Sequence, residues 1–271
     1  MSLFAIGDPH LSFGCQKPMD IFKGWENHAV RLEKNWKDTV EKEDTVVLPG
    51  DISWAMNFEE LLPDFQFLHS LPGKKVILKG NHDYWWATRN KMDQFLLRNG
   101  LDSIEVLHNS CICAEGFRLC GTRGWLFENG QPHDEKVLAR EAGRLRISLE
   151  AAKEKEGELL VFLHYPPIFG QEVNLPILET LLEFDVRRVY YGHIHASGCS
   201  YALKLLQLVA VYAGAEHCGG FVGVCAVAVP AGNAAASLLH YALGYDVVPV
   251  FGEYERLNVD ALLMHPVKYE A

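Results

Sequence analysis

The chain has 271 residues, of which 49% are hydrophobic and 22% are charged, a balance typical of a globular, soluble protein. Its formal net charge of −10 argues against a main partner that is nucleic acid, because such binding draws on clustered lysine and arginine. No N-terminal targeting signal is evident, since residues 2–6 lead directly into a polar motif. We therefore expect a cytoplasmic protein, and one domain of this length is ordinary for an α/β enzyme.

Strands and helices alternate through the first 200 residues. Short apolar, β-branched runs predict strands at residues 3–6, 45–48, 75–78, 159–163 and 187–191. Apolar residues at helical spacing, or long charged stretches, predict helices at residues 27–40, 59–71, 88–97 and 134–155. Between residues 104 and 119 the pattern shortens into strand-like pieces. Helices that alternate with buried strands favour a layered α/β architecture.

The composition changes near residue 199. From residue 199 to residue 250 the only charged side chains are Lys204, Glu216 and Asp246. One interpretation is a pair of buried strands that complete a sheet. A membrane segment is a weaker one, because the most apolar piece covers only residues 221–229 and a span needs about 20 residues. A third is that the segment departs from the pattern of the preceding chain, as a change of reading frame would produce.

Five polar blocks each follow a predicted strand directly. They are Gly7-Asp8-Pro9-His10, Gly50-Asp51, Gly80-Asn81-His82-Asp83, His164 and Gly192-His193-Ile194-His195. Because parallel strands deliver their following loops to one edge of a sheet, we expect the blocks to converge on one pocket. On extended backbone, residues two apart face the same side, so Asp8 would lie beside His10 and His193 beside His195. Imidazole nitrogens, carboxylates and an amide suit manganese, iron or zinc.

In this order, the motifs DxH, GD, GNHD, H and GHxH resemble those of the calcineurin-like metallophosphoesterase superfamily. The resemblance spans residues 8–195, and flanking segments such as PGDISWAM and KGNHDYWW resemble a mostly uncharacterised bacterial branch. It implies an α/β fold of two packed β-sheets flanked by helices, in four αββα layers. We expect a single metallophosphoesterase domain over residues 1–271, in which residues 199–271 form an atypical apolar tail.

The resemblance also implies two divalent metal ions, of manganese, iron or zinc. Asp51 would bridge them, with Asp8, His10 and His195 completing the first site and Asn81, His164 and His193 the second. A metal-bound hydroxide would attack phosphorus directly. His82 follows a ligand and is not one itself, so it would protonate the leaving oxygen as the catalytic acid.

The substrate is expected to be a small phosphodiester or phosphomonoester, with no role for nucleic acid or a membrane. Ser/Thr protein phosphatases of the superfamily carry the motif GDxxDRG, and here Trp54 stands where its second aspartate would be. The acidic partner of the catalytic histidine is therefore missing, and Asp83 could replace it only if its side chain turned back. Arg123 could bind the substrate phosphate through its planar guanidinium, or form a structural ion pair.

Two other functions fit the same motifs. A catalytically inactive fold that serves as a binding scaffold would be expected to have lost His82 or several ligands, and all are present. A nuclease would require a basic groove or a DNA-binding appendage, and the sequence shows neither.

Overall fold

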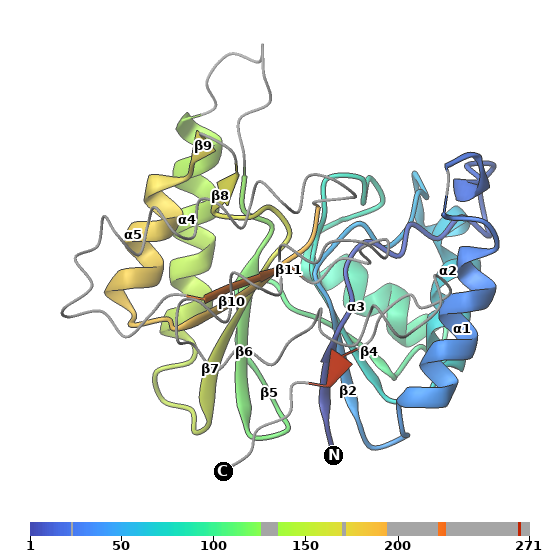
Figure 1. Cartoon of the computed structure of the whole chain (residues 1–271), viewed down its shortest axis with the longest axis horizontal. Coiled ribbons are helices and arrows are strands. Elements are labelled where there is room, and N and C mark those ends of the chain that lie inside the picture. The colour runs from blue at the N-terminus through green and yellow to red at the C-terminus, as the bar shows by residue number, and fades with distance from the viewer. Residues whose placement is uncertain (23, 126–134, 170–171, 194–221, 226–264, 267–271) are drawn as a thin grey trace.

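Two five-stranded sheets stand next to each other, with helices on the far side of each (Figure 1). This computed structural model describes residues 1–22, 24–125, 135–169, 172–193, 222–225 and 265–266. The architecture is the predicted one of two packed sheets flanked by helices, so the expected fold class is confirmed.

The first sheet is built mostly from the N-terminal third of the chain. Its order is β12-β1-β2-β3-β4, with β1 to β4 parallel and β12 antiparallel to β1. The strands are β1 (Leu3–Ala5), β2 (Thr45–Leu48), β3 (Lys74–Ile77), β4 (Ile104–Val106) and β12 (His265–Pro266). The helices between them are the short 3-10 helix η1 (Met19–Ile21), α1 (His28–Thr39), α2 (Phe58–Ser70) and α3 (Arg89–Arg98).

The second sheet has the order β11-β10-β7-β6-β5, in which only β5 is antiparallel to its neighbour. Its strands are β5 (Ile112–Ala114), β6 (Phe117–Thr122), β7 (Glu158–Leu163), β10 (Arg188–Tyr191) and β11 (Val222–Cys225). The helices α4 (Glu135–Glu150) and α5 (Leu175–Glu183) accompany it. A small hairpin joins β8 (Ile168–Phe169) to β9 (Glu172–Val173).

Side-chain alternation along the strands explains why the sheets stack. In β2, Val46 and Leu48 belong to the core beneath the first set of helices, whereas Val47 belongs to the core between the two sheets. In β7, Val161 packs beneath the helices of the second sheet, while Phe162 faces the core between the sheets. Both faces of each sheet are therefore buried, which accounts for the continuous apolar runs in the sequence.

The predicted strands and four predicted helices lie where the sequence places them, but α5 was not predicted. Its start nevertheless carries a sequence signal: the Asn174 side chain accepts a hydrogen bond from the Ile177 amide at 3.1 Å, and Pro176 lies in the first turn. The helix expected over residues 134–155 ends at Glu150 and continues as turns, so its predicted C-terminal end was wrong.

The apolar C-terminal segment contributes one short strand to each sheet. Strand β11 pairs in parallel with β10, and β12 pairs with β1. The sequence interpretation placed a pair of strands in one sheet, whereas the two described strands are divided between the sheets. None of the helices in the described part of the chain is long and apolar enough to cross a membrane. The single-domain assignment for residues 1–271 stays a prediction.

Candidate metal centre

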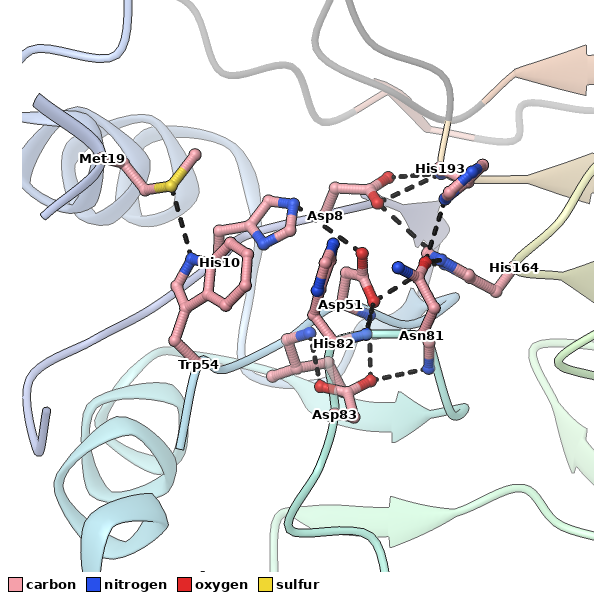
Figure 2. A network of polar contacts seen from close by, with 12 residues as sticks. Asp8, His10, Met19, Asp51, Trp54, Asn81, His82, Asp83, His164 and His193 are labelled. Carbon is pink, nitrogen blue, oxygen red and sulfur yellow. Dashed lines mark hydrogen bonds and ion pairs between the residues drawn. The ribbon is translucent and has the colours of Figure 1, made fainter. Parts of the chain in front are cut away.

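The polar loops that follow five strands meet at one place in the molecule (Figure 2). Two groups of side chains have ligand atoms within 4.8 Å of one another: Asp8, His10 and Asp51 form one, and Asp51, His164 and His193 form the other. Asn81 adjoins the second group, with its Oδ1 3.0 Å from Nδ1 of His193. The structure thus brings six of the seven predicted ligands together, and the seventh, His195, lies outside the described residues.

Asp51 occupies the position between the two groups. One of its oxygens, Oδ1, lies 3.5 Å from Nε2 of His164, and the other, Oδ2, lies 3.9 Å from Nε2 of His10. Each oxygen is therefore directed at a different histidine. This is the arrangement in which one carboxylate can contact two cations.

Electrostatics at the centre favour a bound cation. Asp8 and Asp51 are each 1% exposed, and Asp83 behind them is fully buried. Burial, followed by the charges of Asp83 and Asp8, raises the pKa of Asp51 to about 9. Carboxylates in such proximity repel one another, and a divalent ion between them would reverse that effect. The donor set therefore fits a divalent metal.

The imidazole of His164 gives a second reason to expect a bound cation at the centre. Its Nδ1 lies 3.1 Å from the carbonyl oxygen of Pro49, which places the ring proton on Nδ1. Burial lowers the pKa of His164 to about 3, so the ring is neutral and Nε2 carries a lone pair. Nε2 lies 2.6 Å from Oδ1 of Asn81, so that two acceptor atoms face each other. Two acceptors at this distance are stabilised by a cation shared between them, and a backbone carbonyl is a common orienting partner for a metal-binding histidine.

The backbone of the ligand loops differs from the extended form expected from the sequence. Asp8, His10, Asp51 and His193 have φ angles of 56°, 45°, 50° and 71°, in the left-handed region that non-glycine residues rarely adopt. The expectation of an extended backbone at Asp8 and His10 was therefore wrong, although their side chains do belong to the same ligand group. Their loop turns sharply after β1, and the two side chains reach the centre from a bent backbone.

Two glycines allow the loops to approach this closely. A Cβ atom on Gly80 would lie 2.1 Å from the Asp51 amide nitrogen, and one on Gly192 would lie 2.6 Å from Oδ2 of Asp8. The loop after Gly192 is further held by the His193 amide, which donates to both carboxylate oxygens of Asp8 at 3.1 and 3.0 Å. Glycine at these two positions is thus a requirement of the site's own packing.

Asp83 connects the loop after β2 to the loop after β3 through hydrogen bonds. Its carboxylate accepts hydrogen bonds from the amides of Gly80 at 2.6 Å, Asp51 and Ile52 at 2.9 Å, and Ser53 at 3.3 Å. The sequence left open whether Asp83 turns back to orient His82. The structure directs its oxygens to these backbone amides instead, so its role is to position Asp51.

Replacing Asp83 by asparagine should lower the free energy of unfolding by about 2–3 kcal/mol, because hydrogen bonds to a charged group contribute about 1.5–3 kcal/mol. The asparagine would also direct an NH₂ group at backbone amides that need an acceptor. Urea unfolding of Asp83→Asn and of a control, Asp185→Asn, checks this, since the side chain of Asp185 is 85% exposed. Equal stability of the two variants would contradict the clamping role.

His82 lies at the rim of the centre, between aromatic rings. Its amide donates to Oδ1 of Asp51 at 2.8 Å, and its ring lies 4.4 Å from the ring of Trp54, centre to centre. Trp54 also stacks on His10, with ring centres 5.0 Å apart and an interplanar angle of 22°. The residue that replaces the expected aspartate is therefore itself part of the site. The position of Trp54 was evident from the sequence, whereas its contacts with the two histidines were not predicted.

Arg123 directly follows β6 and forms the structural ion pair that the sequence left open, while its role in binding the substrate phosphate stays a prediction. Its guanidinium lies 3.5 Å from the buried carboxylate of Glu141 and over the ring of Trp125, 4.8 Å from the ring centre. It also lines a cavity at the carboxyl edge of the sheets. Trp85 is buried in the core, while Trp86 lines the same cavity as Arg123.

Several known proteins are similar to this chain. Among solved structures, similar folds include a protein of unknown function from Aquifex aeolicus (14% identity, covering 83% of this chain and 89% of that one, TM-score 0.41). Others are a protein from Thermus thermophilus (16% identity, 70% and 80% coverage, TM-score 0.45) and a phosphopantetheinyl hydrolase from Mycobacterium tuberculosis (14%, 72% and 83%, TM-score 0.41). No curated protein matches the sequence. Residues 1–197 match the profile of the calcineurin-like phosphoesterases, and the chain belongs to that family.

Proposed function

We propose that the protein is a dinuclear-metal-dependent phosphoesterase that hydrolyses small phosphodiesters or phosphomonoesters by direct attack of water. The observation that carries this proposal is the shared position of Asp51 in two ligand groups. When bound, two divalent ions would neutralise phosphoryl charge and make a water molecule nucleophilic near neutral pH. Asp8, His10 and His195 would hold one ion with Asp51, and Asn81, His164 and His193 the other.

Three side chains have the other roles in the proposed reaction. His164, held by the Pro49 carbonyl, presents one nitrogen to the centre in a fixed direction. His82 lies beside the candidate ligands with its amide donating to Asp51, and its imidazole would pass a proton to the departing oxygen. Arg123 contributes to substrate binding from the adjoining cavity.

We favour phosphodiesters over phosphomonoesters, because Trp54 replaces the acidic residue found in the protein phosphatases of the superfamily. An indole packed against His82 limits the room beside that histidine and offers an apolar wall. A wall of this kind suits an organic substituent on the phosphate more than a protein loop.

The protein should bind two divalent ions per chain and hydrolyse chromogenic phosphoesters only when loaded. Elemental analysis of protein saturated with manganese measures the stoichiometry, and a panel of nitrophenyl mono- and diesters, with and without chelator, measures turnover. Binding of a single ion at saturation would refute the dinuclear proposal. Loaded protein that hydrolyses no ester would favour the alternative of an inactive scaffold.

A further inference from the structure

A cavity of about 460 Å³ adjoins the candidate metal centre. Lys79, which lines it, directly precedes Gly80 and Asn81, and Trp86 follows the same loop. On the other sheet the cavity is lined by Arg123, whose carbonyl oxygen accepts the amide of His164 at 3.1 Å. None of the six described candidate ligands lines it. The cavity is thus a separate compartment at the same edge of the fold, within the 300–1,000 Å³ typical of ligand sites.

The cavity is strongly basic in an acidic protein. Four cationic side chains line it against a single carboxylate, Glu141, although the whole chain has a net charge of −10; the four are Lys79, Lys91, Arg123 and Arg144. An excess of positive charge in a hollow attracts an anion.

Glu141 holds two of the cations in place. Its carboxylate is fully buried, accepts the Thr122 hydroxyl at 2.7 Å and pairs with Arg144 at 2.7 Å and with Arg123 at 3.5 Å. One carboxylate shared by two guanidinium groups leaves further donors of both free to bind a ligand. Lys91 on α3 also lines the cavity.

The guanidinium of Arg123 has unused hydrogen-bonding capacity. Its side chain is only 15% exposed, and its Nε is buried with no hydrogen-bond acceptor among the described residues. Leaving a buried donor unpaired carries a cost that a ligand oxygen would remove. The rings of Trp86 and the side chains of Leu78 and Leu107 add apolar surface to the same cavity. Anion-binding and apolar groups are therefore combined in one compartment.

We infer that this cavity binds a second phosphate group of the substrate, distinct from the phosphate hydrolysed at the metal centre. The inference rests on the proposed function and narrows it to small phosphoesters that carry an additional phosphate. The apolar surface would contact the organic part that joins the two groups. Planar guanidinium groups match phosphate oxygens in pairs, which favours phosphate over a single carboxylate.

Binding of inorganic pyrophosphate to metal-free protein, measured by calorimetry, tests the cavity without turnover. We expect wild-type protein to bind pyrophosphate, and Lys91→Gln and Arg144→Gln to bind it about tenfold more weakly each, as loss of a charge-assisted hydrogen bond implies. Arg140→Gln, on the same helix α4 but outside the cavity, should bind like wild type. Lys91→Gln leaves Glu141 and its partners intact, which guards against misfolding. Absent binding, or equal affinities in all variants, would overturn the inference.

A matched pair of substrates tests whether the site acts in catalysis. The p-nitrophenyl ester of thymidine 5′-phosphate can be compared with the same ester carrying a 3′-phosphate, because the reacting bond and leaving group are identical. Wild type should prefer the 3′-phosphorylated ester by about tenfold in kcat/KM, mainly through KM, and Lys91→Gln should lose that preference while Arg140→Gln keeps it. Equal kcat/KM values in wild type would overturn the inference. Failure to hydrolyse either ester would count against the proposed function, and calorimetry would then decide on the cavity alone.

Discussion

Replacing Asp51 by asparagine is expected to remove nearly all phosphoesterase activity and to lower the metal occupancy of both proposed sites. Each oxygen of Asp51 faces a different histidine, so loss of its charge weakens both sites at once. Loss of residues that only support metal ligands typically costs about 10–100-fold, and the loss here should exceed that range. Asparagine has nearly the same shape as aspartate, so the comparison isolates the charge. Steady-state kcat/KM and metal content of the purified variant are the measurements.

His10→Ala is the appropriate control, because His10 belongs to only one of the two ligand groups, the one that contains Asp8 and Asp51. At equal metal occupancy its loss of activity should be smaller than that of Asp51→Asn. Comparable losses for the two variants would contradict the bridging assignment and would leave Asp51 as an ordinary ligand.

His82→Ala should lower kcat about 10²–10⁴-fold, the usual contribution of a positioned acid, while both metal ions remain bound. The variant removes the imidazole but keeps the backbone amide that donates to Asp51 at 2.8 Å. The geometry of the centre is therefore retained, and elemental analysis should give the wild-type metal content. Loss of metal would show that His82 had been assigned the wrong role.

A comparison of substrates with different leaving groups distinguishes acid catalysis by His82 from its other roles. Nitrophenolate needs little protonation as it departs, whereas an alkoxide needs a proton. The fall in kcat should therefore be smaller for nitrophenyl esters than for alkyl esters. Equal losses on both would mean that His82 instead orients the phosphate or stabilises its charge.

The sequence predicted the parts of the site that depend on strand ends. Each ligand block follows an apolar run, and parallel pairing alone brings Asp51 and Asn81 to the same edge. The sequence therefore predicted that the candidate ligands lie together at this edge. The left-handed backbone of these loops could not be predicted from the sequence. The conformation of Asp8 and His10 is set by contacts between loops that are distant in sequence.

The basic cavity could not be predicted from sequence patterns either, because it too depends on segments that are distant in sequence. Lys91 and Arg144 lie on α3 and α4, where charged residues are most simply solvent-facing. Only the packing of two helices beside two different sheets brings them together with Arg123. Arg123 directly follows β6, whereas nothing local distinguishes Arg144 from the exposed Arg140.

The left-handed backbone at the metal centre has a consequence for protein engineering. A non-glycine residue in a rarely populated conformation costs on the order of 1–3 kcal/mol, and four of the candidate ligand residues adopt one. Another scaffold given the same side chains at the ends of its strands would relax these loops and move the ligand atoms apart. A transplant of this centre would have to include Asp83 and its four amide contacts as well. These hydrogen bonds hold the loops that carry Asp51 and Asn81 in position.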